Sequence, residues 1–282
     1  MRNNQDRVGP ITGGESPPIQ QSQQAEQPLQ FVTPTEFVEL PSKGRFYPPE
    51  HPLHNMEMIE IRHMTAKDED ILTSRSLLKK GVAIDRFLQN VIVDRRVKVE
   101  DLLIGDKNAV IIAARISGYG EKYDANIVCP VCASSVQFAF DLSDCSIVSY
   151  NDHVDEVRLT EDNTFIIRAD KLEADVEVRL MTSRDETFLM QYSEKRRKKK
   201  LPESGLTDQF RRFIVSVNGN RDPGYIDSFI EHLPAIDSRK IRTVYQQIIP
   251  NVDMDHVFTC SECGFEGEVS VPFGANFFWP QQ

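Results

Sequence analysis

Long hydrophobic runs are missing from this 282-residue sequence. No stretch approaches the roughly 20 uncharged residues that a membrane-spanning helix needs. The opening residues, MRNNQDRVGP, also lack the basic and then apolar layout of a secretory signal peptide. These absences predict a soluble protein that has no membrane span and is not exported.

Cysteine is scarce, and positive charge is in deficit. The chain has five cysteines, and its 33 Lys and Arg are outnumbered by 43 Asp and Glu, which gives a formal net charge of −10. An odd number of cysteines without an export signal disfavours a disulfide framework, so we expect reduced thiols that are free to hold a metal. The acidic balance argues against binding of a nucleic-acid backbone over the whole surface.

Motifs of known enzyme chemistry are missing as well. The sequence contains no Gly-rich phosphate loop, no nucleophile elbow and no recognisable spacing of Ser, His and Asp. The six histidines show neither an HExxH motif nor paired spacing, and we interpret each as a packing or surface residue. We therefore expect no enzymatic activity and no small-molecule substrate.

What the chain does contain begins with a polar arm. Residues 1–34 hold seven Gln and five Pro but few large apolar side chains, so they cannot bury enough surface to offset the entropy lost on ordering. We expect a disordered N-terminal arm. Residues 35–64 predict an extended strap, FVELPSKGRFYPPEHPL, in which prolines interrupt apolar residues, and then a strand, MEMIEIRHM, with alternating apolar positions.

Helical signals dominate residues 65–120. TAKDEDILTSRSLLKKG starts with Thr65 as a cap, has an acid three residues later and ends on a basic pair and Gly81, which predicts one helix with both ends defined. IDRFLQNVIV and DKNAVIIAARI repeat apolar residues at helical spacing, the second with Asp106 as its expected cap. These patterns predict the first part of a helical body.

The remaining sequence alternates between strand and helix signals. Residues 121–145 predict a hairpin around one cysteine pair, and residues 251–282 predict a second cysteine hairpin and a C-terminal tail. Residues 146–250 predict short strands (EVRL, TFIIRA, VEVRL), a helix opened by a Ser183 to Glu186 capping box, and helices within TDQFRRFIVSVN, YIDSFIEHL and SRKIRTVYQQII. Apart from the two cysteine pairs, no repeat of fixed period is recognisable.

The expected fold class follows from this order of elements. It is α+β, with a mainly helical body and a small zinc-ribbon-like β element formed by two sequence-distant hairpins.

Two CxxC pairs carry the strongest chemical signal. CPVC contains Cys129 and Cys132, CSEC contains Cys260 and Cys263, and each pair lies between two strand-like segments. A spacing of two lets both sulfurs of a turn face one ion, and zinc prefers four thiolates in a tetrahedron. We predict one structural Zn2+ held by these four cysteines. Metal-free thiols and a redox-active CxxC stay open as alternatives, although redox pairs usually begin a helix.

The long gap between the pairs shapes this prediction. Residues 133–259 would form an insertion that emerges from a zinc ribbon. Four thiolates leave no open position for water or substrate, so we do not expect a catalytic zinc. Cys145 has no partner at a suitable spacing and is expected to be an ordinary structural thiol.

A short basic run, KRRKKK at residues 195–200, allows two interpretations. It can bind nucleic acid, or it can be the solvated end of a helix, where cations complement the helix dipole. We favour the helix end, because the chain is acidic and no aromatic residue is interleaved with the run. A zinc-ribbon nucleic-acid-binding regulator stays open as an alternative function, and a thiol oxidoreductase is a second one.

Several long phrases resemble one protein family. LPSKGRFYP, MTAKDEDILTSRSLLKKG, LLIGDKNAVIIAARISGYGEKY and CPVC followed by FDL, in that order, are similar to the baseplate hub and hub-assembly proteins of T-even-type contractile-tailed bacteriophages. The likeness is strong over residues 38–145 and looser in FIEHLPAIDSRKIR, CSECGFEG and FFWP.

The resemblance implies a non-enzymatic role in tail morphogenesis. The protein would be either a subunit of the baseplate hub or a factor that helps the hub assemble, with other hub or tail proteins as partners. It would act in the host cytoplasm during assembly and could remain in the tail baseplate of the virion. The zinc prediction rests on the cysteine spacing, and residues 1–34 depart from the family pattern.

Overall fold

The computed structural model describes residues 32–150, 154, 156–202, 204–273, 277 and 278. The chain divides into two units, Met1–Val32 and Thr33–Gln282, and the fold below is that of the second unit. The predicted disordered arm lies almost wholly outside the described residues.

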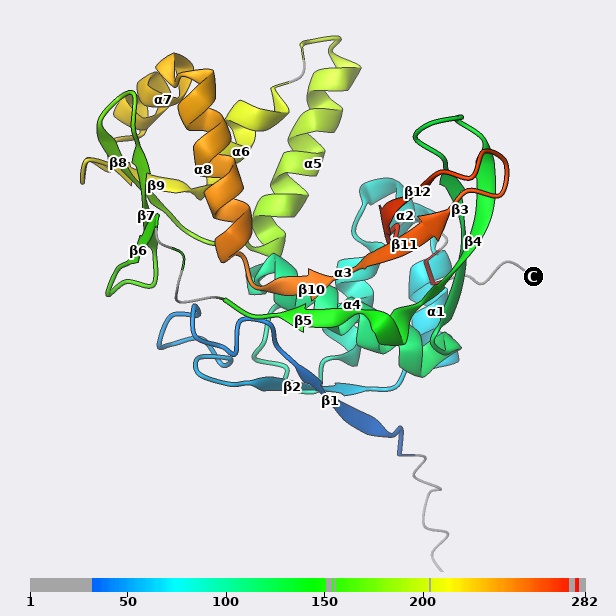
Figure 1. The fold of residues 1–282 in the computed structure, drawn as a ribbon. Coiled ribbons are helices and arrows are strands. Elements are labelled where there is room, and N and C mark those ends of the chain that lie inside the picture. Colours follow the sequence, from blue (N-terminus) through cyan, green and yellow to red (C-terminus); the bar gives the residue numbers. More distant parts are fainter. Residues whose placement is uncertain (1–31, 151–153, 155, 203, 274–276, 279–282) are drawn as a thin grey trace, which may run out of the picture. The chain divides into compact units, whose positions relative to one another are not determined.

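Helices and strands both contribute to the described part, as Figure 1 shows. It contains eight α-helices and two short 3-10 helices. The α-helices are α1 Ala66–Thr73, α2 Arg75–Lys80, α3 Ala83–Val91, α4 Ile104–Tyr119, α5 Ser183–Lys198, α6 Gly205–Phe213, α7 Pro223–His232 and α8 Ala235–Ile248; the 3-10 helices are η1 Val99–Asp101 and η2 Leu142–Asp144.

Twelve strands of the described residues form five antiparallel sheets. Four sheets are pairs: β1 Thr35–Glu39 with β2 Met58–Arg62, β3 Lys122–Val128 with β4 Ser135–Asp141, β5 Ser146–Val148 with β10 Asn251–Asp253, and β11 Asp255–Thr259 with β12 Glu266–Ser270. The fifth has the order β6 Val157–Leu159, β7 Phe165–Ala169, β8 Ala174–Val178 and β9 Ile214–Val217.

The prediction of a mainly helical body is wrong. Strands β7 and β8 supply fully buried core residues such as Phe165 and Val176, so the sheet is part of the body rather than an appendage. The segment TDQFRRFIVSVN is helical only as far as Phe213, and IVSV then forms β9 beside β8. β-branched residues favour this pleated arrangement once a partner strand is available, which local helical spacing does not reveal.

Two helix predictions need smaller corrections. The expected helix from Thr65 to Gly81 is broken at Ser74, whose extended backbone separates α1 from α2. Its predicted ends are confirmed, because Thr65 forms a capping box and Gly81 adopts a left-handed φ of 67°. The capping box of α5 begins one residue earlier than predicted, at Thr182.

The strap packs on its own chain. Leu40 and Tyr47 are buried, and the first residues of the strap belong to strand β1. The Tyr47 hydroxyl donates to Asp106 Oδ2 at 2.7 Å, and the Ser42 hydroxyl donates to the same oxygen at 2.6 Å. Asp106 is therefore not the cap of α4, which begins at Ile104, but the anchor of the strap.

The structure also reveals an internal repeat that was not predicted. IEIRHMTAKDE, residues 59–69, and VEVRLMTSRDE, residues 176–186, share Glu, Arg, Met, Thr, Asp and Glu at the same spacing. The first segment joins β2 to α1, and the second joins β8 to α5. We call residues 33–150 the first half and residues 156–273 the second half.

The arginine and the second acid of the repeat form the same clamp in both halves. Arg62 donates to both oxygens of Asp68 at 2.7 and 2.9 Å, and Arg179 donates to both oxygens of Asp185 at 2.8 Å. Each aspartate also accepts from the N–H and the hydroxyl of the threonine that caps its helix. The clamp thereby fixes the angle at which a helix leaves its strand.

A buried aspartate in each long helix holds the loop of the corresponding hairpin. Asp106 on α4 accepts the N–H of Ser42 at 2.9 Å. Asp237 on α8 accepts the N–H of Lys171 at 3.0 Å and that of Leu172 at 3.2 Å. Ser42 follows β1 and Lys171 follows β7, so the two halves agree in their loops as well as in their clamps.

Candidate metal centre

The first cysteine pair lies in the turn between β3 and β4. The N–H of Ala133 donates to the carbonyl of Cys129 at 2.9 Å, and the N–H of Cys129 donates to the carbonyl of Ser134 at 2.9 Å. Ala133 adopts a left-handed φ of 57°, which closes the turn directly after Cys132. Both thiols are thereby brought to the same side of the hairpin end.

The second pair repeats this turn between β11 and β12. The N–H of Gly264 donates to the carbonyl of Cys260 at 2.9 Å, and the N–H of Cys260 donates to the carbonyl of Phe265 at 2.8 Å. Gly264 has a φ of 70°, which glycine adopts at no steric cost. The two halves thus present matching knuckles, as Figure 1 shows for the two hairpins.

The four sulfurs of the two knuckles lie together. The Sγ atoms of Cys129, Cys132, Cys260 and Cys263 are all within 4.8 Å of one another. Cys129 Sγ is 3.7 Å from Cys263 Sγ, and Cys132 Sγ is 3.8 Å from Cys260 Sγ. A disulfide would need about 2.05 Å. A zinc tetrahedron with about 2.3 Å bonds has sulfur–sulfur edges of about 3.8 Å, so the donor set fits this ion.

Apolar side chains of the two hairpins pack against the buried cysteines. Cys129 and Cys260 are 1% exposed and pack with the fully buried Phe258. The rings of Phe138 and Phe258 meet edge to face across the two hairpins, with centroids 5.6 Å apart. Each knuckle supplies one buried and one exposed cysteine, and the buried cysteines pack in the same cluster as the two rings.

Charge is distributed unevenly over the thiols. The hydroxyl and N–H of Ser134 lower the pKa of Cys132 to about 6. The N–H of Phe265 also lowers the pKa of Cys263, but desolvation and the three neighbouring sulfurs outweigh it and raise that pKa to about 12. Once one thiolate is present, a second one this close is unfavourable unless a cation joins them.

Cys145 and His256 lie outside the cluster. Cys145 is half-buried against the core, and burial raises its pKa to about 11, so it has little thiolate character. Nε2 of His256 lies 2.9 Å from the carbonyl oxygen of Asp141, which links β11 to η2 and β4, and the ring packs edge-on against Phe140.

A comparison with protein families identifies the chain. Residues 33–279 match the family model described as T4 bacteriophage base plate protein. The chain belongs to this family. The match confirms the resemblance read from the sequence, and the chain is a T4-type baseplate protein. No curated protein and no solved structure matches it in the corresponding searches.

The basic run of this baseplate protein lies where a helix ends. Residues Lys195 to Lys198 form the last turn of α5, and Lys199 follows as its C-cap. Arg196 donates to the carbonyl of Pro202, which closes the turn after the helix. Within the described residues, no helix of this baseplate protein is long and apolar enough to cross a membrane.

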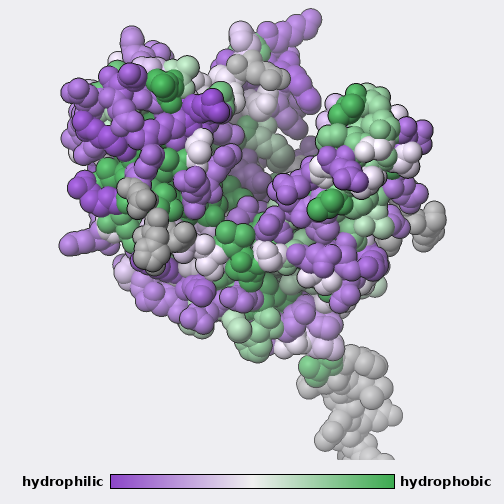
Figure 2. Space-filling view, in the orientation of Figure 1, coloured by the Kyte–Doolittle hydropathy of each residue, from purple (hydrophilic) through white to green (hydrophobic). Residues whose placement is uncertain are grey.

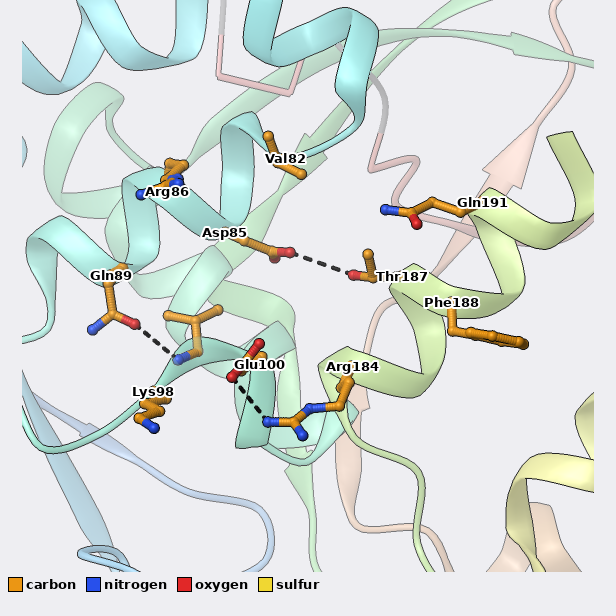
Figure 3. A pocket seen from close by; sticks show the side chains of 11 residues that line it. Val82, Asp85, Arg86, Gln89, Lys98, Glu100, Arg184, Thr187, Phe188 and Gln191 are labelled. Atoms are coloured by element: carbon orange, nitrogen blue, oxygen red, sulfur yellow. Dashed lines mark hydrogen bonds and ion pairs between the residues drawn. The ribbon is translucent and has the colours of Figure 1, made fainter. Parts of the chain in front are cut away.

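A pocket of about 550 Å³ lies between α3 and α5, and Figure 3 shows its side chains. Some of the polar groups drawn there are joined in pairs. Arg184 donates to Glu100 at 2.9 Å, and the Thr187 hydroxyl lies 3.4 Å from Asp85. These pairs connect α5 to η1 and α3 and stabilise the contact between the halves.

The surface over the cysteine cluster is more apolar than its surroundings. Figure 2 shows hydrophobic residues at the tip of the two hairpins, on a face that is otherwise mostly hydrophilic. Val128, Val131 and Val257 are the exposed hydrophobics of these hairpins, with Val257 75% exposed.

Sequence reasoning found the four sulfurs of this baseplate protein but missed their supporting residues. Ser134 and Phe258 carried no recognised motif. The position directly after each CxxC adopts positive φ in both knuckles, at Ala133 and Gly264, and only the glycine signals this in the sequence.

Proposed function

We propose that this baseplate protein serves the central hub of the baseplate without catalysing a reaction, as a hub subunit or as a factor that helps the hub assemble. We further propose that one zinc ion, held by Cys129, Cys132, Cys260 and Cys263, stabilises it. The family membership and the long phrases that resemble hub proteins support the first statement. The approach of four sulfurs to within 4.8 Å of one another carries the second.

The role of this zinc is structural. Four thiolates complete the coordination shell and leave no position for substrate. The ion would tie the first half to the second at knuckles that lie 128 residues apart, between Cys132 and Cys260. A surface with many partners and no chemistry of its own needs such rigidity more than it needs an open metal site.

The geometry disfavours a thiol oxidoreductase. Both knuckles are strand–turn–strand structures, whereas a redox CxxC gains its reactivity from a helix N-terminus. Sulfurs of different pairs approach to 3.7 and 3.8 Å, which matches coordination of one ion by both pairs.

Elemental analysis tests the zinc. Protein purified without added metal should contain about one equivalent per chain. Cys129→Ser and Cys263→Ser should each lower the zinc content and the melting temperature. Cys145→Ser is the matched control and should retain full zinc. Full zinc in either knuckle variant would show that the four thiols do not share an ion.

Mass spectrometry of phage particles tests the hub role. A hub subunit should be present in purified virions at a fixed ratio to other baseplate proteins. An assembly factor should be present in infected cells and absent from virions. For either role, deletion of the gene should prevent assembly of the hub. Normal hubs in the absence of the protein would contradict both forms of the proposal.

A further inference from the structure

The two halves differ at one edge of their sheets. In the second half, β7 lies between β8 and β6, so both of its edges are paired. In the first half, β1 pairs with β2 alone, and no other strand among the described residues pairs with its outer edge.

Strands β1 and β7 occupy equivalent positions in the repeat. Val38 pairs with Ile59, the first residue of the first repeated segment. Ile167 pairs with Val176, the first residue of the second. Val38 therefore corresponds to Ile167, and the outer edge of β1 corresponds to the edge of β7 that β6 covers.

The open edge exposes backbone groups and an aromatic ring. The N–H of Leu40 donates to Glu57 and the N–H of His63 donates to Pro34, so even-numbered residues of β1 face β2. By alternation, the N–H and C=O groups of Thr35, Phe37 and Glu39 face outward. The Phe37 side chain is 68% exposed.

Glu36 is the unusual residue of this strand. It corresponds to Phe165, which is fully buried in the second half. Oε1 of Glu36 is buried, and no hydrogen-bond partner for it exists in the described part of the chain. A buried carboxylate oxygen without a partner is costly, and a cationic side chain from an added strand would satisfy it.

We propose that the outer edge of β1 is completed by an antiparallel β-strand of another baseplate protein, one that alternates apolar residues with Lys or Arg. The second half supplies the template for the strand. Charge selects its composition, because Glu36 and Glu39 both lie on β1. Addition of a strand to an open sheet edge is an established mode of recognition.

The same charge disfavours a second copy of this chain. Pairing of β1 with β1 would bring Glu36 and Glu39 of both copies together, and each chain has a net charge of −10. This inference uses the family membership of the chain and depends on neither the hub role nor the zinc.

Hydrogen exchange of residues 33–40 tests the edge directly. In the purified full-length protein, the outward amides of Thr35, Phe37 and Glu39 should exchange rapidly, and the inward amide of Val38 should exchange slowly. In baseplate assemblies that contain the protein, the outward amides should slow by at least about tenfold. Rapid exchange in both states would overturn the proposal. Slow exchange in the purified protein would also overturn it, because the chain's own residues or a second copy would then cover the edge.

Phe37→Pro provides a matched variant. It removes an outward N–H without removing a bond to β2, so the melting temperature should stay close to that of the wild type. Incorporation of Phe37→Pro into baseplate assemblies should fall by about tenfold. Incorporation of Phe37→Ala, which retains the N–H, should fall less. Glu36→Lys should also reduce incorporation, whereas Glu36→Gln should reduce it less. Normal incorporation of the folded Phe37→Pro variant, or of Glu36→Lys, would contradict the proposal.

Discussion

The first and second halves of this baseplate protein share their supports and differ in their surfaces. Each has a clamp between an arginine and an aspartate, a buried aspartate that holds a hairpin loop, and a CxxC knuckle. The second half closes its sheet with β6 and extends α5 into solvent, whereas the first half leaves β1 uncovered and breaks its helix at Ser74. The repeated residues therefore maintain the fold, and the regions that differ are candidates for contacts with partners.

Removal of the proposed zinc should give the largest effect, because the ion would cross-link the two halves through both knuckles. A cross-link that closes a loop of 128 residues contributes about 5 kcal/mol of chain entropy. A strong chelator should therefore lower the melting temperature steeply. Cys129→Ser and Cys260→Ser, which remove the buried cysteine of each knuckle, should lower it equally. A large difference between them would show that the knuckles are not equivalent.

Disruption of the arginine–aspartate clamps should give the next largest loss of stability. The loss should differ between the clamp of the first half and that of the second half. Asp68 has a fully buried side chain and accepts from Arg62 and from Asn90, whereas Arg179, the partner of Asp185, is 38% exposed. Asp68→Asn should cost roughly 3 to 4 kcal/mol and Asp185→Asn about 2, measured by urea unfolding. Equal losses would contradict this ranking.

The loss of stability at acid pH should include a contribution from the clamp of Asp68 with Arg62. Burial by itself raises the pKa of Asp68. Hydrogen bonds from Arg62, Thr65 and Asn90 outweigh burial and hold this pKa at about 2. A folded pKa below the ordinary value of 3.8 stabilises the protein above that pH, and the contribution is lost as the pH falls towards 2. Stability of Asp68→Asn should therefore depend less on pH between about 4 and 2 than that of the wild type.

The strap should respond differently at two of its aromatic positions, Tyr47 and Phe37. The Tyr47 hydroxyl donates to Asp106 and accepts the N–H of Leu103 at 3.1 Å, so Tyr47→Phe leaves the buried N–H of Leu103 unpaired, removes one donor from Asp106, and should cost about 2 kcal/mol. Phe37→Ala, at an exposed ring, should change stability by less than about 0.5 kcal/mol. Thermal unfolding measures both. A large loss for Phe37→Ala would place its ring in the core.

Local signals predicted the parts of the fold that are local. Thr65 with Asp68, Gly81 and each single CxxC turn act within a few residues, and each has a recognisable sequence pattern. Long-range partners were missed for the same reason. Asp106 reads as a helix cap until Ser42 and Tyr47 approach it from 64 and 59 residues away.

The repeat was visible in the sequence but not as a fixed period. IEIRHMTAKDE and VEVRLMTSRDE share their spacing, but the segments that follow them differ in length and in helix breaks. Their equivalence becomes clear when Arg62 and Arg179 form the same two hydrogen bonds. IVSV was missed as a strand because its partner, β8, lies far back in the chain.

Neutralisation of the basic run should have the smallest effect. Both α2 and α5 end in basic residues, as expected where cations complement a helix dipole, although the run on α5 is longer. Gln substitution of Lys195, Arg197, Lys198, Lys199 and Lys200 should change the free energy of unfolding by well under 1 kcal/mol, because these side chains are exposed. Arg196→Gln should cost more than any one of them, because Arg196 holds the carbonyl of Pro202 and packs on the Tyr192 ring.

DNA affinity measured at two salt concentrations should be weak for the wild type and nearly unchanged in the variant with the five Gln substitutions. A tight wild-type complex that the substitutions weaken, with a reduced dependence on salt, would instead make α5 a nucleic-acid-binding element that the first half lacks.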